Sequence, residues 1–140
     1  MDQFKLDLFK QEFDEPLLYQ VISVQDEIKL ENILFSFEVN VTNKSDLFNR
    51  LLKNLPYKVL YKNLESTNNV QNLLEKFNIT DEKVNLIWSY PDEIDSLSIS
   101  YLIDDWKYIW YATSDEAVIL FFAKTNLLIL ITDYGVYYHN

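Results

Sequence analysis

Residues 117–132 read AVILFFAKTNLLILIT, and this stretch decides the fold class. Two strongly apolar runs, 117–124 and 127–132, flank Thr125 and Asn126, and turn-forming residues between two such runs predict a tight β-hairpin. Neither run alternates between apolar and polar residues. This pattern indicates two central strands of a sheet that is covered on both faces.

The rest of the last third also favours strands, because it is rich in β-branched and aromatic residues. Gly135, which follows Tyr134, can adopt the positive φ that a turn requires. We expect four further strands in this part of the chain, over residues 84–90, 96–103, 106–113 and 136–139.

The first half supplies helices that could cover the sheet. We expect helices over residues 4–13, over residues 46–54 with Ser45 as the N-terminal cap, and from Ser66 or Thr67 to Asn78. Pro16 and Pro56 end the first two, and Asn78 tolerates the left-handed cap that ends the third. Strands are expected over residues 17–24, 33–41 and 57–61. The predicted fold class is α+β, a mainly antiparallel sheet with helices packed on it.

The composition predicts a single globular domain over residues 1–140. Hydrophobic residues make up 49% of the chain, which is enough for a core and too apolar for intrinsic disorder. The longest apolar runs are too short to cross a bilayer, and the first residues lack the basic start and apolar stretch of a secretion signal. We therefore expect a cytoplasmic protein without membrane association.

The formal net charge is −10, which disfavours binding to nucleic acid or anionic membranes. The acidic residues have two interpretations: a solvated surface that aids solubility, or a face shaped for a basic protein. Residues 43–64 reverse the sign, with five bases against Asp46 alone. This basic stretch could associate with the acidic tail of a second copy, which leaves a homodimer open.

The side chains offer little catalytic machinery. There is no Cys, the one Gly cannot build a phosphate-binding loop, and the one histidine, His139, lies beside the C-terminus. Carboxylate pairs such as Glu93 with Asp95 could in principle act as acid and base, but we expect no enzyme. Asp92-Glu93-x-Asp95 superficially resembles a calcium loop and lacks the loop glycine, so neither a metal nor a cofactor is predicted.

An aromatic row lies in the predicted strand over residues 106–113. Alternation places Trp106, Tyr108 and Trp110 on one face of this strand. One interpretation is that this face is core. Aromatic rows also stack nucleic-acid bases, but such platforms are accompanied by positive charge, and acids flank this one. An aromatic row bordered by acids suits a protein interface better, because Trp and Tyr dominate binding hot spots.

Residues 104–122 read DDWKYIWYATSDEAVILFF, and residues 127–135 read LLILITDYG. This tail resembles those of small bacterial immunity proteins from polymorphic-toxin and contact-dependent inhibition systems. In those immunity proteins, an aromatic-rich segment ends in a Ser-Asp-Asp or Ser-Asp-Glu turn and leads into a hydrophobic hairpin. The likeness covers roughly the last 35 residues. Ala112-Thr113 stands where that pattern has proline, which argues against assignment to one family.

The resemblance implies an antitoxin that binds and neutralises a cognate toxin domain, often a basic nuclease. An acidic, rigid domain can occupy a cationic cleft, with charge speeding encounter and buried aromatics slowing escape. The expected partner-binding residues are Asp92, Glu93, Asp95, Asp104, Asp105, Trp106, Trp110, Asp115 and Glu116. The alternative is a protein-interaction or oligomerising domain without a toxin partner.

Overall fold

The structure is a computed structural model, and it describes residues 3–36, 47–55, 57–59, 67–90, 93–104, 118–132 and 135–139. The helices in these ranges are α1 (Gln3–Phe13), α2 (Val24–Ser36), α3 (Leu47–Asn54), α4 (Thr67–Lys76) and α5 (Ser100–Asp104). The strands are β1 (Tyr19–Val21), β2 (Tyr57–Val59), β3 (Lys83–Ser89), β4 (Glu93–Ser98), β5 (Val118–Phe122), β6 (Leu127–Thr132) and β7 (Gly135–His139).

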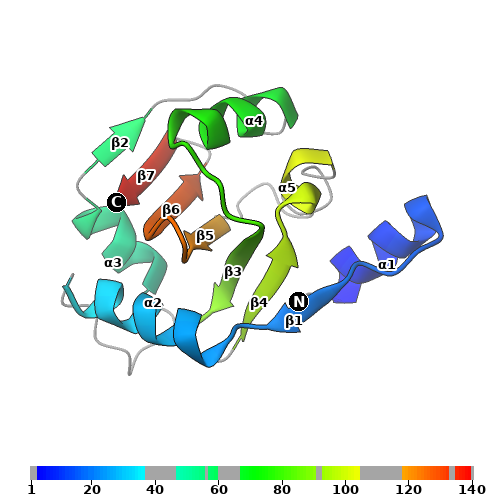
Figure 1. Cartoon of the computed structure of the whole chain (residues 1–140), viewed down its shortest axis with the longest axis horizontal. Helices are drawn as coiled ribbons and strands as arrows, with labels where there is room; N and C mark the ends of the chain where they lie inside the picture. The colour runs from blue at the N-terminus through cyan, green and yellow to red at the C-terminus, as the bar shows by residue number, and fades with distance from the viewer. Residues whose placement is uncertain are drawn as a thin grey trace.

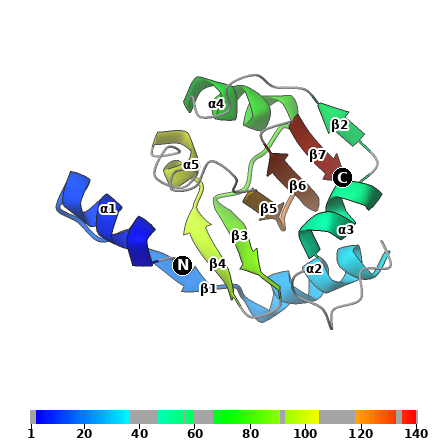
Figure 2. The ribbon, with the colours of Figure 1, turned by 180° about the vertical axis from the view of Figure 1, so that it is seen from behind.

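The strands form one seven-stranded sheet in the order β1-β4-β3-β5-β6-β7-β2, with every neighbouring pair antiparallel (Figure 1). The predicted α+β class with a mainly antiparallel sheet is therefore confirmed. The strand β1 lies at one edge of this sheet and β2 at the other. The short β1 joins α1, which lies at the outer end of the molecule in Figures 1 and 2, to α2.

Helices cover both faces of the sheet, as the apolar hairpin predicts. The side chains of β5 and β6 alternate between two separate apolar clusters, so both strands are buried throughout. One cluster joins Val118, Leu120 and Phe122 to buried residues of α1, α4 and α5. The other joins Ile119 and Phe121 to buried residues of α2 and α3. Figures 1 and 2 accordingly show α4 and α2 on opposite sides of the sheet.

Local signals place the turns correctly. Asn126, with a φ of 58°, lies in the turn between β5 and β6, and Asn78, with a φ of 52°, follows the end of α4. The amide of Ile79 donates to the carbonyl of Leu74 at 3.0 Å, which closes the C-terminal turn of α4. Gly135, with a φ of 145°, begins β7. The predicted hairpin turn and the cap at Asn78 are confirmed. Gly135 has the positive φ that was predicted, but Tyr134 lies outside the described residues, so the turn itself stays a prediction.

The predicted strands over residues 17–24 and 33–41 are wrong in most of the described positions. Only Tyr19–Val21 form a strand, and residues 24–36 form α2, so residues 33–36 are helical. Leu30, Ile33 and Leu34 are buried with the spacing of a helix face. Phe35 is exposed, and its presence beside the buried residues produced the apparent strand pattern. Residues 37–41 lie outside the described part of the chain.

The predicted strand over residues 96–103 is also wrong beyond its first half. The strand β4 ends at Ser98, and the amide of Ser100 approaches the Ser98 hydroxyl at 3.4 Å. The amide of Leu102 then donates to the carbonyl of Ile99, which begins the helical turn of α5. Short hydroxyl side chains bond to nearby backbone in this way and so compete with strand pairing.

Two further predictions concern other segments. The predicted strand over residues 106–113, with Trp106 and Trp110, lies outside the described residues. Within the described residues, no helix has both the length and the apolar character needed to span a bilayer.

Candidate functional site

The structure describes three of the nine residues predicted to bind a partner. Asp104, the last residue of α5, is exposed, and Glu93, the first residue of β4, is half-buried. The third is Asp95. The other six lie outside the described residues: Asp92, Asp105, Trp106, Trp110, Asp115 and Glu116.

Asp95 faces the core instead of solvent, which corrects its place in the predicted acidic face. It is 5% exposed, and the indole Nε1 of Trp88 donates a hydrogen bond to its carboxylate at 3.0 Å. Its partner across the sheet is Leu86, a residue of the apolar cluster that α4 covers. Asp95 therefore connects β3 to β4 and is not available to a macromolecular partner.

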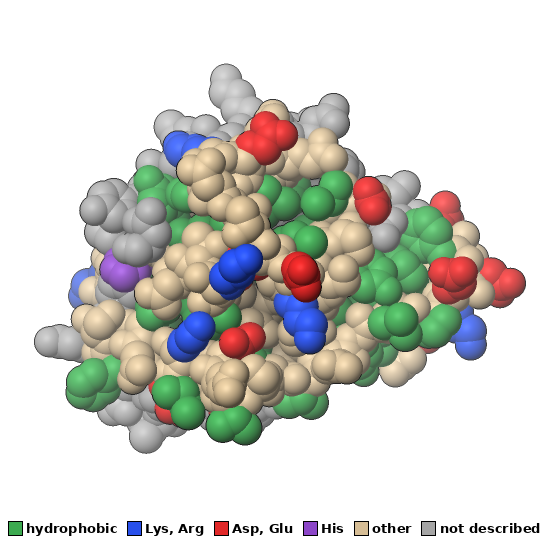
Figure 3. Space-filling model, in the orientation of Figure 1, with side chains coloured by type: hydrophobic (Ala, Val, Ile, Leu, Met, Phe, Trp, Pro, Cys, Tyr) green, Lys and Arg blue, Asp and Glu red, His purple; other side chains and the backbone are tan. Residues whose placement is uncertain are grey.

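The most open apolar surface of the described chain lies on α2. Val24, Ile28 and Phe35 are separated by four and seven residues, a spacing that places them on one face of the helix. Val24 is 72% exposed and Phe35 is 84% exposed, whereas the opposite face of α2 is buried in the core. In Figure 3, green side chains follow the lower edge of the molecule, where Figure 1 places α2. A helix with two apolar faces has one available for binding.

Polar contacts hold α2 in this orientation. The hydroxyl of Ser23 accepts a hydrogen bond from the amide of Asp26 at 3.2 Å and caps the helix. The Asn85 amide Nδ2 on β3 donates to the Asp26 carboxylate at 3.3 Å, and the Lys29 ammonium donates to the carbonyl of Ala123 at 3.4 Å. These contacts come from one side of the helix, so the apolar stripe is held facing solvent.

The edge strand β1 carries further exposed apolar residues. Leu18, Tyr19 and Val21 are exposed, with Val21 at 79%, and β1 leads through two residues into α2. No charged residue occurs between Glu15 and Asp26. Tyr19 and Val21 pair with Leu97 and Asp95, so their side chains lie on the face of the sheet that α4 covers, whereas α2 packs on the other face. We call the exposed apolar residues of β1 and α2 together the apolar margin, defined by Leu18, Tyr19, Val21, Val24, Ile28 and Phe35.

Acidic side chains border the apolar margin. Asp14 and Glu15 precede β1 and are exposed, and Glu27 and Glu31 lie on α2. Residues 3–36 carry seven acids against three bases, which are Asp7, Glu12, Asp14, Glu15, Asp26, Glu27 and Glu31 against Lys5, Lys10 and Lys29. An apolar surface with a rim of one charge is suited to a protein partner of the opposite charge.

The field of these acids reaches a buried tyrosine. Tyr90 is 2% exposed, and its hydroxyl has no hydrogen-bond partner among the described residues. Burial, followed by the charges of Glu31 and Glu27, raises the pKa of Tyr90 to about 12. The hydroxyl is therefore neutral at physiological pH, and the negative potential of α2 extends inward as well as outward.

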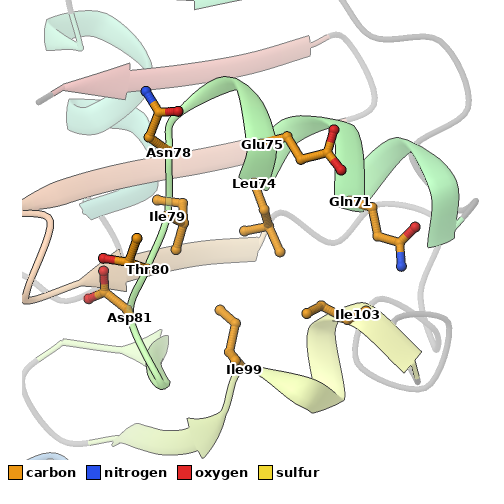
Figure 4. Close-up of a pocket in the computed structure, with 9 residues that line it drawn as sticks. All are labelled: Gln71, Leu74, Glu75, Asn78, Ile79, Thr80, Asp81, Ile99 and Ile103. Atoms are coloured by element: carbon orange, nitrogen blue, oxygen red, sulfur yellow. The ribbon is translucent and has the colours of Figure 1, made fainter.

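A cavity of about 710 Å³ lies between α4 and α5 (Figure 4). Leu74, Ile99 and Ile103 point into it, and its two carboxylates, Glu75 and Asp81, lie apart from one another. Asp81 is bonded to the β5–β6 hairpin, because its carboxylate accepts from the Lys124 amide at 2.8 Å and from the Thr125 hydroxyl. An acid–base mechanism needs two converging groups, so this lining does not favour catalysis.

The described residues contain no group of three or more His, Cys, Asp or Glu side chains that could hold a metal ion. A comparison of the chain with models of protein families, with curated proteins and with solved structures finds no significant match. The apolar margin with its acidic rim is the candidate site of the described chain.

Proposed function

We propose that this chain is an immunity protein that acts in the cytoplasm, where it binds and neutralises a cognate toxin domain of basic charge. The apolar margin with its acidic rim is the observation that carries this proposal. It combines the two properties that such a role demands, an anchor that excludes water and a field that attracts cations. The resemblance of residues 104–135 to immunity-protein tails points to the same role.

The two parts of the surface have different tasks in this proposal. Asp14, Glu15 and Glu27 accelerate the encounter with a cationic toxin, and this effect weakens as salt concentration rises. Ile28 and Phe35 bury their side chains in the complex and slow dissociation. A toxin that cleaves nucleic acid presents a cationic cleft for phosphate, which this surface can cover. Glu93 and Asp104 stay part of the proposed contact, with the predicted tail residues Asp92, Asp105, Trp106, Trp110, Asp115 and Glu116.

The proposal is tested by co-expression with the protein encoded immediately upstream, with growth and co-purification as readouts. The double variant Ile28→Ser/Phe35→Ser removes two exposed anchors, whereas Leu52→Ser removes an exposed leucine on α3 outside the margin and serves as the matched control. We expect the double variant to bind about 100-fold more weakly, because each anchor contributes roughly 1–2 kcal/mol. The control should rescue growth as the unchanged chain does.

Three outcomes would contradict the proposal or part of it. If the upstream protein is neither toxic nor bound, the immunity function is wrong. If the partner binds through the margin without being toxic, the alternative of a general interaction domain holds. If rescue survives neutralisation of Asp104, Asp105, Asp115 and Glu116 together, those tail acids are not part of the contact.

A further inference from the structure

We propose that the open edge of β1 receives an extended, basic segment of the partner, which adds one strand to the sheet. This inference rests on the proposed function, since it assumes a partner of positive charge. It specifies how the partner binds: backbone hydrogen bonds at β1, with side-chain contacts to the rest of the apolar margin.

The backbone of β1 has donors and acceptors directed away from the sheet. The amide of Ile22 donates to the carbonyl of Ile94 at 3.1 Å, and the amide of Leu18 donates to the Tyr101 hydroxyl at 3.2 Å. Backbone groups alternate in direction along a strand, so the N–H and C=O groups of Tyr19 and Val21 point toward the open edge. Because β1 ends the strand order, no described strand pairs with them.

The sequence of β1 lacks the features that protect exposed edges. Edge strands usually carry a charged residue, a proline or a bulge that prevents pairing with another chain. The strand at the opposite edge, β2, has Lys58 at its centre, whereas β1 reads Tyr-Gln-Val. This edge strand is uncharged and its Val21 is 79% exposed, so it is open to pairing with a further strand.

Charge selects a basic segment over a second copy of this chain as the occupant. The uncharged stretch is bracketed by Asp14 and Glu15 on one side and by Asp26 and Glu27 on the other. Antiparallel pairing of two copies at β1 would place the end of one strand that follows Asp14 and Glu15 beside the end of the other strand that leads into Glu27, so acids would lie near acids at both ends. A strand with an apolar centre and Lys or Arg at its ends would instead face acids at both ends.

A hollow beside β1 offers room for a side chain of the added strand. It has a volume of about 530 Å³, and its lining includes Leu18, Gln20, Ser96 and Tyr101. Gln20 belongs to β1, Ser96 to β4 and Tyr101 to α5. The lining also includes Glu82 and Lys83 at the start of β3, so the hollow extends from β1 across β4. Its mixed lining suits a side chain that is apolar along its length and polar at its tip.

The test uses two synthetic peptides, Lys-Val-Thr-Val-Thr-Val-Lys and its counterpart with Glu at both ends. Amide resonances and hydrogen exchange of the isotope-labelled chain are followed as each peptide is added. We expect the lysine peptide to slow exchange at the Tyr19 and Val21 amides about tenfold or more. The glutamate peptide should bind at least about tenfold more weakly.

Val21→Pro removes an outward N–H without touching a bond to β4, and proline is tolerated at an edge. Val21→Thr keeps the N–H and is the matched control. Thermal melting checks that both variants fold. The proline variant should lose the peptide effect and the threonine variant should keep it.

The proposal is overturned if neither peptide binds, if the end charges make no difference, or if protection appears away from β1. It is also overturned if the free chain is a dimer in sedimentation that Val21→Pro dissociates, because the edge would then take a second copy. If the Val21→Pro variant neutralises a toxin as well as the unchanged chain does, strand addition is refuted and the proposed function stays intact. Protection of Tyr19 and Val21 by the lysine peptide without any neutralised toxin would refute only the proposed function.

Discussion

Two adjacent residues of α2, Leu34 and Phe35, should respond in opposite ways to truncation. Leu34 is fully buried and packs with Leu30 in the cluster beneath α2, whereas Phe35 is 84% exposed. Leu34→Ala removes buried methyl groups and leaves a cavity, which costs about 3 kcal/mol of unfolding free energy. For a chain of this length that loss lowers the melting temperature by about 10 °C.

Phe35→Ala should have almost no effect on stability. The ring has little contact area to lose, and alanine favours a helix by about 0.5 kcal/mol relative to phenylalanine. The expected change is therefore within about 0.5 kcal/mol of zero. Urea-induced unfolding followed by circular dichroism measures both variants under the same conditions. A loss above about 1.5 kcal/mol for Phe35→Ala would mean that the ring is packed in the free chain, and the apolar margin would not be open.

Three further predictions concern single polar groups. Asp81→Ala should lower the unfolding free energy in urea by about 3 kcal/mol, because it removes the acceptor for two bonds from the β5–β6 hairpin. The matched change at the exposed neighbour, Glu82→Ala, should change it little, and equal effects would contradict a stabilising role for the two Asp81 bonds. The raised pKa of Tyr90 means that the native state holds this proton longer than the unfolded chain, so stability should fall as pH rises from 10 to about 12. Tyr90→Phe should lack this decrease in unfolding measured against pH, and an unchanged profile would refute the assignment. Asp95→Ala should alter tryptophan fluorescence and cost about 2 kcal/mol while leaving partner binding intact, and loss of binding in a well-folded variant would return Asp95 to the contact.

The fold was predictable from the sequence where local chemistry decides the structure. The hairpin at Asn126 and the helix end at Asn78 depend on residues that tolerate positive φ, and this preference is local. The central position of β5 and β6 followed from their unbroken apolar runs. The structure of residues 33–36 was not predictable in this way, because Phe35 carries no mark that it is exposed. The exposure of Phe35 depends on which residues lie near it in space, and not on its neighbours in the sequence.

The candidate site was less predictable than the fold. The burial of Asp95 could have been found, because Asp95 and Leu97 share one face of β4 and Leu97 suits a core. The sequence carries one signal of the apolar margin, the uncharged stretch between Glu15 and Asp26 in a chain of net charge −10. Exposed apolar residues look the same as core residues in a sequence. Glu31 marks the exposed face only once residues 24–36 are known to form a helix.

The orientation of α2 follows from its charged residues, because its two apolar faces are similar in size. Burying either face would give a similar stabilisation, roughly 2 kcal/mol for each side chain. Glu31, however, lies in the stripe between Ile28 and Phe35, so burying that face would also bury a carboxylate. The observed orientation leaves Glu31 in solvent and gives Asn85 and the Ala123 carbonyl their partners on α2. A partner that covers the exposed face must therefore bring a cation for Glu31, which is the same requirement that the acids at both ends of β1 impose.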